Sequence, residues 1–155
     1  MKSVRHPSAR RQTGFTMIEL IVVIVILGIL AATALPKFID LRTEAVDSTV
    51  NGVAGNLASA MSVNYAGCSA VNHDDTNPAK CTQINECKLA GKLLQGVTPD
   101  ATTGGFTIGN TAFTVAPKTV GTDITANGTT ATCTLTGVNG STTRTADFQG
   151  IGGGN

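Results

Sequence analysis

The stretch RRQTGFTMIELIVVIVILGIL, residues 10–30, decides the fold of the N-terminal part of this chain. Two arginines and a glycine precede an almost unbroken apolar run, and one carboxylate, Glu19, interrupts that run. A lone charged side chain inside a bilayer costs at least a few kcal/mol and usually marks a function. The role of Glu19 is therefore the first question that the sequence raises.

The apolar run is long enough to cross a membrane. Residues 15–35 number 21 and span about 31 Å as an α-helix. Four basic residues and no acid precede Gly14, whereas the rest of the chain has 7 basic and 10 acidic residues. This asymmetry predicts a cytoplasmic N-terminus and an exported C-terminal part, and it gives no reason to expect nucleic-acid binding. The four basic residues are Lys2, Arg5, Arg10 and Arg11.

The helical pattern continues beyond Pro36 to about Gly67, but there it becomes amphipathic. Apolar residues recur at spacings of four, three, four and four, which predicts one buried face. Pro36 removes one backbone hydrogen bond, and each of Gly28, Gly52 and Gly55 costs about 1 kcal/mol relative to alanine. The predicted buried residues are Val46, Val50, Val53, Leu57 and Met61.

Beyond residue 67 the chain first reads as an irregular connector, residues 68–99, with one short helix within residues 84–94. The period then changes to two, and Gly109-Asn110 and Asn127-Gly128 each predict a hairpin turn between two strands. In residues 130–136 small apolar residues alternate with threonines, so one face is expected to be buried. We expect the last residues, 148–155, to be loose apart from Phe148 and Ile151.

The predicted fold class is therefore α+β. A long N-terminal helix, hydrophobic at first and amphipathic later, packs on a small antiparallel β-sheet. The four cysteines all follow the apolar run, where an exported part would hold disulfides. Their even number fits two bridges and allows three pairings, while the absence of a C-x-x-C pair disfavours a zinc site. The cysteines are Cys68, Cys81, Cys87 and Cys133.

In the N-terminal stretch a short basic leader ends at Gly14, Phe15 follows, Glu19 is the fifth residue after Gly14, and the apolar helix runs to Pro36. This pattern resembles that of type IV prepilins, in particular of the type IVa class and its mannose-sensitive haemagglutinin pilins. The resemblance implies that a prepilin peptidase cuts between Gly14 and Phe15 and methylates the new Phe15 amine. It implies four parts: a cleaved leader (1–14), a transmembrane and filament-core helix (15–36), its amphipathic half (37–67) and a globular head (68–155).

In this family Glu19 would offset the ammonium that cleavage creates at Phe15, on its own or a neighbouring subunit. A subunit docked out of step would bury two unpaired charges, so the pair would select the axial register. The alternative is a carboxylate near the membrane surface that extends to water.

Two further features follow from the same resemblance. Filaments of related pilins unwind the segment between a glycine and a proline, here Gly28 and Pro36. Many pilins also close a C-terminal loop with a disulfide, which Cys87 and Cys133 would form here, leaving Cys68 and Cys81 for a second bridge.

The resemblance implies a major structural pilin, held in the inner membrane of a Gram-negative cell before an assembly platform polymerises it with identical subunits. The surface filament would serve adhesion, twitching motility, aggregation or DNA uptake through host, surface or DNA contacts. Alternatives are a minor pilin, a pseudopilin of type II secretion, and a periplasmic binding module with a signal cleaved after Ala32 or Ala34. We expect no enzymatic activity, cofactor or metal, because no nucleophile and base stand out and His73-Asp74-Asp75 lacks a second ligand cluster.

Overall fold

The computed structural model describes residues 14–100 and 102–155, except for the side chains of residues 35–40. The predicted leader therefore lies outside the described residues apart from Gly14. The chain divides into two compact units, Met1–Asp40 and Leu41–Asn155, and helix α1 (Met17–Ala70) contributes to both.

In the first unit, residues 14–16 have no regular structure and α1 begins at Met17. The apolar side chains of residues 15–34 are exposed, and Met17–Ala34 is long and apolar enough to cross a membrane. The Thr33 hydroxyl donates to the Leu30 carbonyl at 3.1 Å, so this polar group is satisfied inside an apolar segment. The helix continues through the positions of Gly28 and Pro36.

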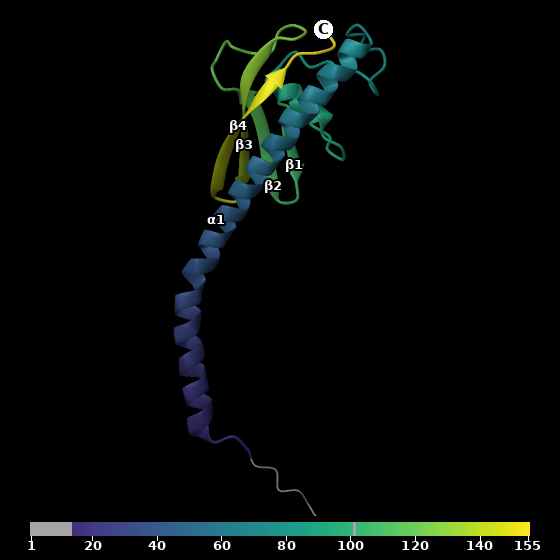
Figure 1. The fold of residues 1–155 in the computed structure, drawn as a ribbon. Helices are drawn as coiled ribbons and strands as arrows, with labels where there is room; N and C mark the ends of the chain where they lie inside the picture. Colours follow the sequence, from purple (N-terminus) through teal and green to yellow (C-terminus); the bar gives the residue numbers. More distant parts are fainter. Residues whose placement is uncertain (1–13, 101) are drawn as a thin grey trace, which may run out of the picture. The chain divides into compact units, whose positions relative to one another are not determined.

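The second unit contains a four-stranded antiparallel sheet in the order β1-β2-β3-β4 (Figure 1). The strands are β1 (Phe106–Ile108), β2 (Thr111–Pro117), β3 (Thr130–Asn139) and β4 (Thr142–Ile151). The predicted turn at Gly109-Asn110 joins β1 to β2, and a second short turn with Gly140 at φ 59° joins β3 to β4. The α+β prediction is confirmed.

The core of the second unit lies between α1 and one face of the sheet. All five residues predicted from the helical spacing are buried there, and the alternation in β3 buries Ala131, Cys133 and Leu135 as predicted. They meet Phe113 and Phe148 from the neighbouring strands. At about 1.5–3 kcal/mol for each large apolar side chain, this burial is what holds helix and sheet together.

The other face of the sheet carries the threonines of β3 and one ionic cluster. The Asp147 carboxylate pairs with the Lys118 ammonium and accepts a hydrogen bond from the Thr134 hydroxyl at 2.6 Å. The hydrogen bond from Lys118, and to a smaller extent the one from Thr134, holds the pKa of Asp147 below its usual value.

Helix α1 ends at Ala70, three residues beyond the expected end at Gly67. The physical reason is that Gly67 serves a close approach: a Cβ built there would lie 2.2 Å from the Lys80 carbonyl oxygen. The short helix expected in residues 84–94 is present as a 3₁₀ helix, η1 (Cys87–Leu93).

Two other expectations about the second unit are wrong. Asn127-Gly128 forms a turn, but no strand precedes it, because the Asp123 side chain accepts the backbone N–H of Cys87 at 2.7 Å and Ile124 enters the core. The C-terminal end is also ordered by long-range contacts.

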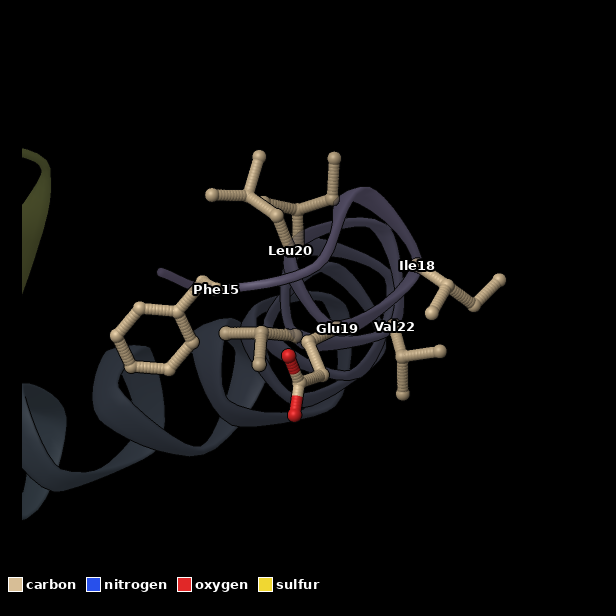
Figure 2. Close-up of a pocket in the computed structure, with 7 residues that line it drawn as sticks. Phe15, Ile18, Glu19, Leu20 and Val22 are labelled. Atoms are coloured by element: carbon tan, nitrogen blue, oxygen red, sulfur yellow. The ribbon is translucent and has the colours of Figure 1, made fainter. Parts of the chain in front are cut away.

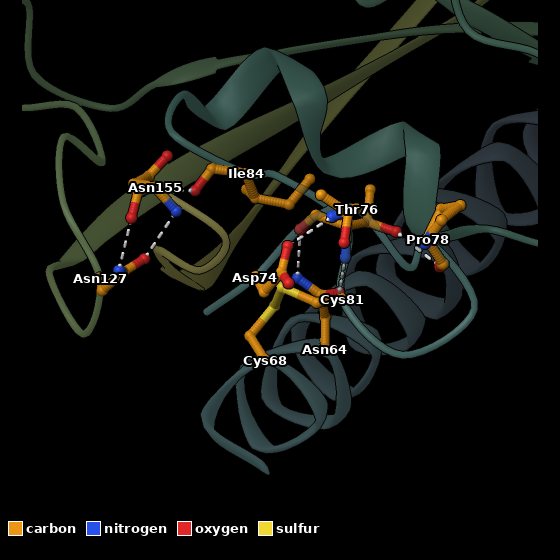
Figure 3. The surroundings of a disulfide bond; sticks show 10 residues. Asn64, Cys68, Asp74, Thr76, Pro78, Cys81, Ile84, Asn127 and Asn155 are labelled. Atoms are coloured by element: carbon orange, nitrogen blue, oxygen red, sulfur yellow. Dashed lines mark hydrogen bonds between the residues drawn. A yellow bond between two sulfur atoms is a disulfide. The ribbon is translucent and has the colours of Figure 1, made fainter. Parts of the chain in front are cut away.

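Gly153 pairs with Ile84 through two backbone hydrogen bonds, and the side chain of Asn127 exchanges two more with the backbone of Asn155 (Figure 3). Such contacts across 28 or more residues leave no local sequence signal.

Candidate functional site

The residues predicted to form the processing site lie in non-helical backbone before α1. Gly14 is exposed, and a Cβ built on it would meet nothing within 4 Å. Phe15 is 91% exposed. The Gly14–Phe15 peptide bond therefore lies outside the helix, in the kind of accessible backbone that a peptidase needs for an extended substrate.

Glu19 closes a capping box with Thr16 at the start of the helix. The backbone N–H and the hydroxyl of Thr16 both donate to Oε2 of Glu19 at 2.8 Å, and the Glu19 N–H approaches the Thr16 hydroxyl oxygen at 3.4 Å. Thr16 precedes the first helical residue and Glu19 is the third, which is the S/T-x-x-E arrangement that satisfies helix N-terminal donors.

Figure 2 shows the Glu19 carboxylate among apolar side chains of the first helical turns, including Ile18, Leu20 and Val22. The described part of this unit offers Glu19 no cation. The carboxylate is thus held by its own chain through hydrogen bonds alone, in a position close to the chain segment where cleavage would create an amine.

Thr16 is the residue that the sequence analysis missed. The signal was present, because a threonine three residues before a glutamate, at the start of an apolar helix, is the capping-box pattern.

The cysteines form two pairs in the second unit. Cys68 in the last turn of α1 is bonded to Cys81 in the connector, with a Cα–Cα distance of 4.4 Å (Figure 3). Cys87 at the start of η1 is bonded to Cys133 in β3, with a Cα–Cα distance of 5.6 Å. These are the two pairs that the resemblance suggests, and all four cysteines are fully buried.

His73 does not gather further ligands. Among the described residues no group of three or more His, Cys, Asp or Glu side chains could hold a metal ion. His73 instead lies beside Tyr65, with ring centroids 5.6 Å apart.

Comparison with known proteins agrees with this geometry. Residues 9–35 match the family model of the prokaryotic N-terminal methylation motif. The chain is 47% identical over 53 residues to a type IV narrow pilus major component, PilA5, of Thermus thermophilus, which covers 34% of this chain and 46% of that protein.

The chain is also 32% identical over 96 residues to the type IV major fimbrial protein FimA of Dichelobacter nodosus, covering 62% of this chain and 59% of that protein. With the type IV major pilin protein PilE1 of Neisseria gonorrhoeae it shares 39% identity over 90 residues, covering 56% of this chain and 39% of that protein. The chain spans about half the length of the curated relatives it matches, and no solved structure matches it.

The motif and the relatives confirm the resemblance to type IV pilins that the N-terminal residues indicate. The relatives are named as pilus and fimbrial components, which are structural subunits and not enzymes.

Proposed function

We propose that this chain is the major structural subunit of a type IV pilus. The precursor lies in the inner membrane through α1, with its N-terminus in the cytoplasm and its second unit in the periplasm. A prepilin peptidase cleaves between Gly14 and Phe15 and methylates the new amine. An inner-membrane assembly platform then moves the subunit into a surface filament of identical chains, which serves adhesion, twitching motility, aggregation or DNA uptake.

The observation that carries this proposal is the placement of Glu19 at the start of an exposed membrane-length helix, one helical turn after an accessible Gly14–Phe15 bond. Cleavage of that bond produces an ammonium on Phe15. Two opposite charges that enter an apolar filament core together cost far less than either charge alone. The Phe15 amine of the same or a neighbouring subunit is therefore the partner that replaces the hydrogen bonds from Thr16.

The experiment compares Glu19→Ala with Thr16→Ala in the full chain. Both substitutions disrupt the capping box, but only Glu19→Ala removes the charge that pairs with the amine. We expect Glu19→Ala to be cleaved normally and to lower sheared surface filaments at least about tenfold, because a mismatched buried charge costs several kcal/mol. Thr16→Ala should keep most filaments, since a lost cap costs only about 1 kcal/mol.

Equal filament loss in both variants would show that capping alone explains Glu19, and normal piliation in Glu19→Ala would remove the charge argument. N-terminal sequencing adds a separate check. Mature chains that begin at methylated Phe15 support the proposal, whereas chains that begin after Ala32 or Ala34 indicate an ordinary secretory signal and a periplasmic binding module.

A further inference from the structure

A groove on the second unit is lined by apolar residues, small polar residues and two lysines. It has a volume of about 740 Å³ and lies between the end of α1, the connector around residues 78–82, and the end of η1. The lining residues that matter are Ser59, Val63, Pro78, Lys80, Lys92 and Leu93.

The groove carries charge and apolar surface that have no partner among the described residues. Val63 is 72% exposed although it belongs to the core-packing helix. Neither Lys80 nor Lys92 forms an ion pair among the described residues, and no acidic residue lines the groove. An occupant that fits this surface offers an apolar side chain next to a carboxylate.

Helix α1 presents such a pair at the beginning of the second unit. Leu41 is 60% exposed, and Glu44 is exposed and has no ion pair in the described part of the chain. Side chains three residues apart lie on the same helix face, so an apolar group and a carboxylate stand side by side.

The Leu41–Glu44 face cannot reach the groove of its own chain. Helix α1 carries this face and also one wall of the groove, and on this helix Glu44 and Ser59 are 15 residues apart, about 22 Å along the axis. A rigid helix does not fold back over that distance, so the match of charge and apolar surface is available only between two chains.

We propose that the groove binds the Leu41–Glu44 face of a second copy of this chain. This inference rests on the proposed function, in which identical subunits stack with their helices parallel. The two copies are then shifted by the 15 to 23 residues that separate Glu44 from Ser59 and Gly67, about 22 to 35 Å along the helix. Val63 and Leu93 meet Leu41, and Lys80 and Lys92 meet Glu44.

The test is a charge swap in the full chain, read as the amount of sheared surface filament relative to the cellular subunit pool. Lys80→Glu/Lys92→Glu and Glu44→Lys should each lower the filament fraction about tenfold or more, because they place like charges opposite each other. The three substitutions together restore opposite charges, so filaments should return to within about threefold of the unsubstituted chain.

Two controls separate this contact from folding and from net charge. Lys80→Arg/Lys92→Arg keeps both charges and should keep filaments. Lys118→Glu changes the net charge in the same direction as each groove substitution, but on the outer face of the sheet, away from the groove residues, so it should reduce filaments far less than either Lys80→Glu or Lys92→Glu alone. An unchanged subunit pool shows that each variant folds.

The proposal is overturned if the lysine variant assembles normally, or if the triple variant is no better than the single changes. If the lysine variant assembles normally but loses adhesion or DNA binding, the groove binds another partner and not a second copy of this chain. If the unsubstituted chain forms no filament, the proposed function itself fails, which is a different outcome from an assembled but charge-insensitive filament.

Discussion

Two glycines of helix α1 have opposite effects on stability: one is required by close packing, and the other only weakens the helix. Gly67 faces the connector, and a methyl group there would collide with the Lys80 carbonyl, a backbone atom that cannot move aside as a side chain does. A Cβ at Gly55 would meet nothing within 4 Å in this chain, so Gly55 only weakens the helix.

We therefore expect Gly67→Ala and Gly55→Ala to change stability in opposite directions. Gly67→Ala should lower the free energy of unfolding by about 1–3 kcal/mol through overpacking, and Gly55→Ala should raise it by about 1 kcal/mol. Urea unfolding of the full chain in detergent, followed by the fluorescence of Tyr65, the only tyrosine, measures both. Equal stability of the two variants would contradict the close approach at Gly67.

Among the elements, those with a repeating local pattern were predictable. The spacing of Val46 to Met61 and the alternation around Cys133 each report on one buried face, so the helix and the central strand could be read directly. The Gly109-Asn110 turn was equally local. The T-x-x-E pattern of Thr16 and Glu19 is equally local, because the capping box joins residues only three positions apart.

The elements that were predicted wrongly depend on distant partners. The residues before Asn127 have strand-like composition, but Asp123 caps the N–H of Cys87, 36 residues away, and this pulls the segment out of the sheet. The glycine-rich end has a composition typical of a loose terminus, yet Gly153 packs beside a disulfide: a Cβ built on Gly153 would lie 3.2 Å from Cys68 Sγ. Glycine fits there because of the disulfide beside it, and no local pattern reveals this.

The two disulfides should contribute unequally to the stability of the second unit. The Cys87–Cys133 bond joins residues 46 apart and Cys68–Cys81 residues 13 apart, so loop-closure entropy gives about 4 and about 3 kcal/mol respectively. Paired substitutions, Cys87→Ala/Cys133→Ala and Cys68→Ala/Cys81→Ala, compared by urea unfolding, should show the larger loss for the first. The reverse order would indicate that the bond beside the C-terminal glycines gains more from packing than from loop closure.

At the scale of the whole molecule, one helix has two tasks in the proposed function. In the membrane, the first part of α1 faces lipid, and every backbone polar group needs a partner within the helix. In a filament, the same part is surrounded by copies of itself, and the second unit faces water. A move from lipid into a filament is easiest where residues weaken the helix without disturbing its apolar surface. Gly28 and Pro36 are such residues.

The last prediction concerns the filament form of residues 28–36. In the single chain this segment is helical, but Gly28 costs about 1 kcal/mol, Pro36 lacks a backbone N–H, and the Thr33 hydroxyl already contacts backbone carbonyls of the preceding turn. Neighbouring chains in a filament can supply the packing that the helix gives up, so we expect the segment to unwind there. Amide hydrogen exchange in residues 28–36 should be at least about tenfold faster in filaments than in the membrane-embedded subunit, while residues 46–61 stay protected in both. Full protection of residues 28–36 in filaments would mean that the helix survives assembly, and that any stretching of the filament comes from sliding between subunits instead.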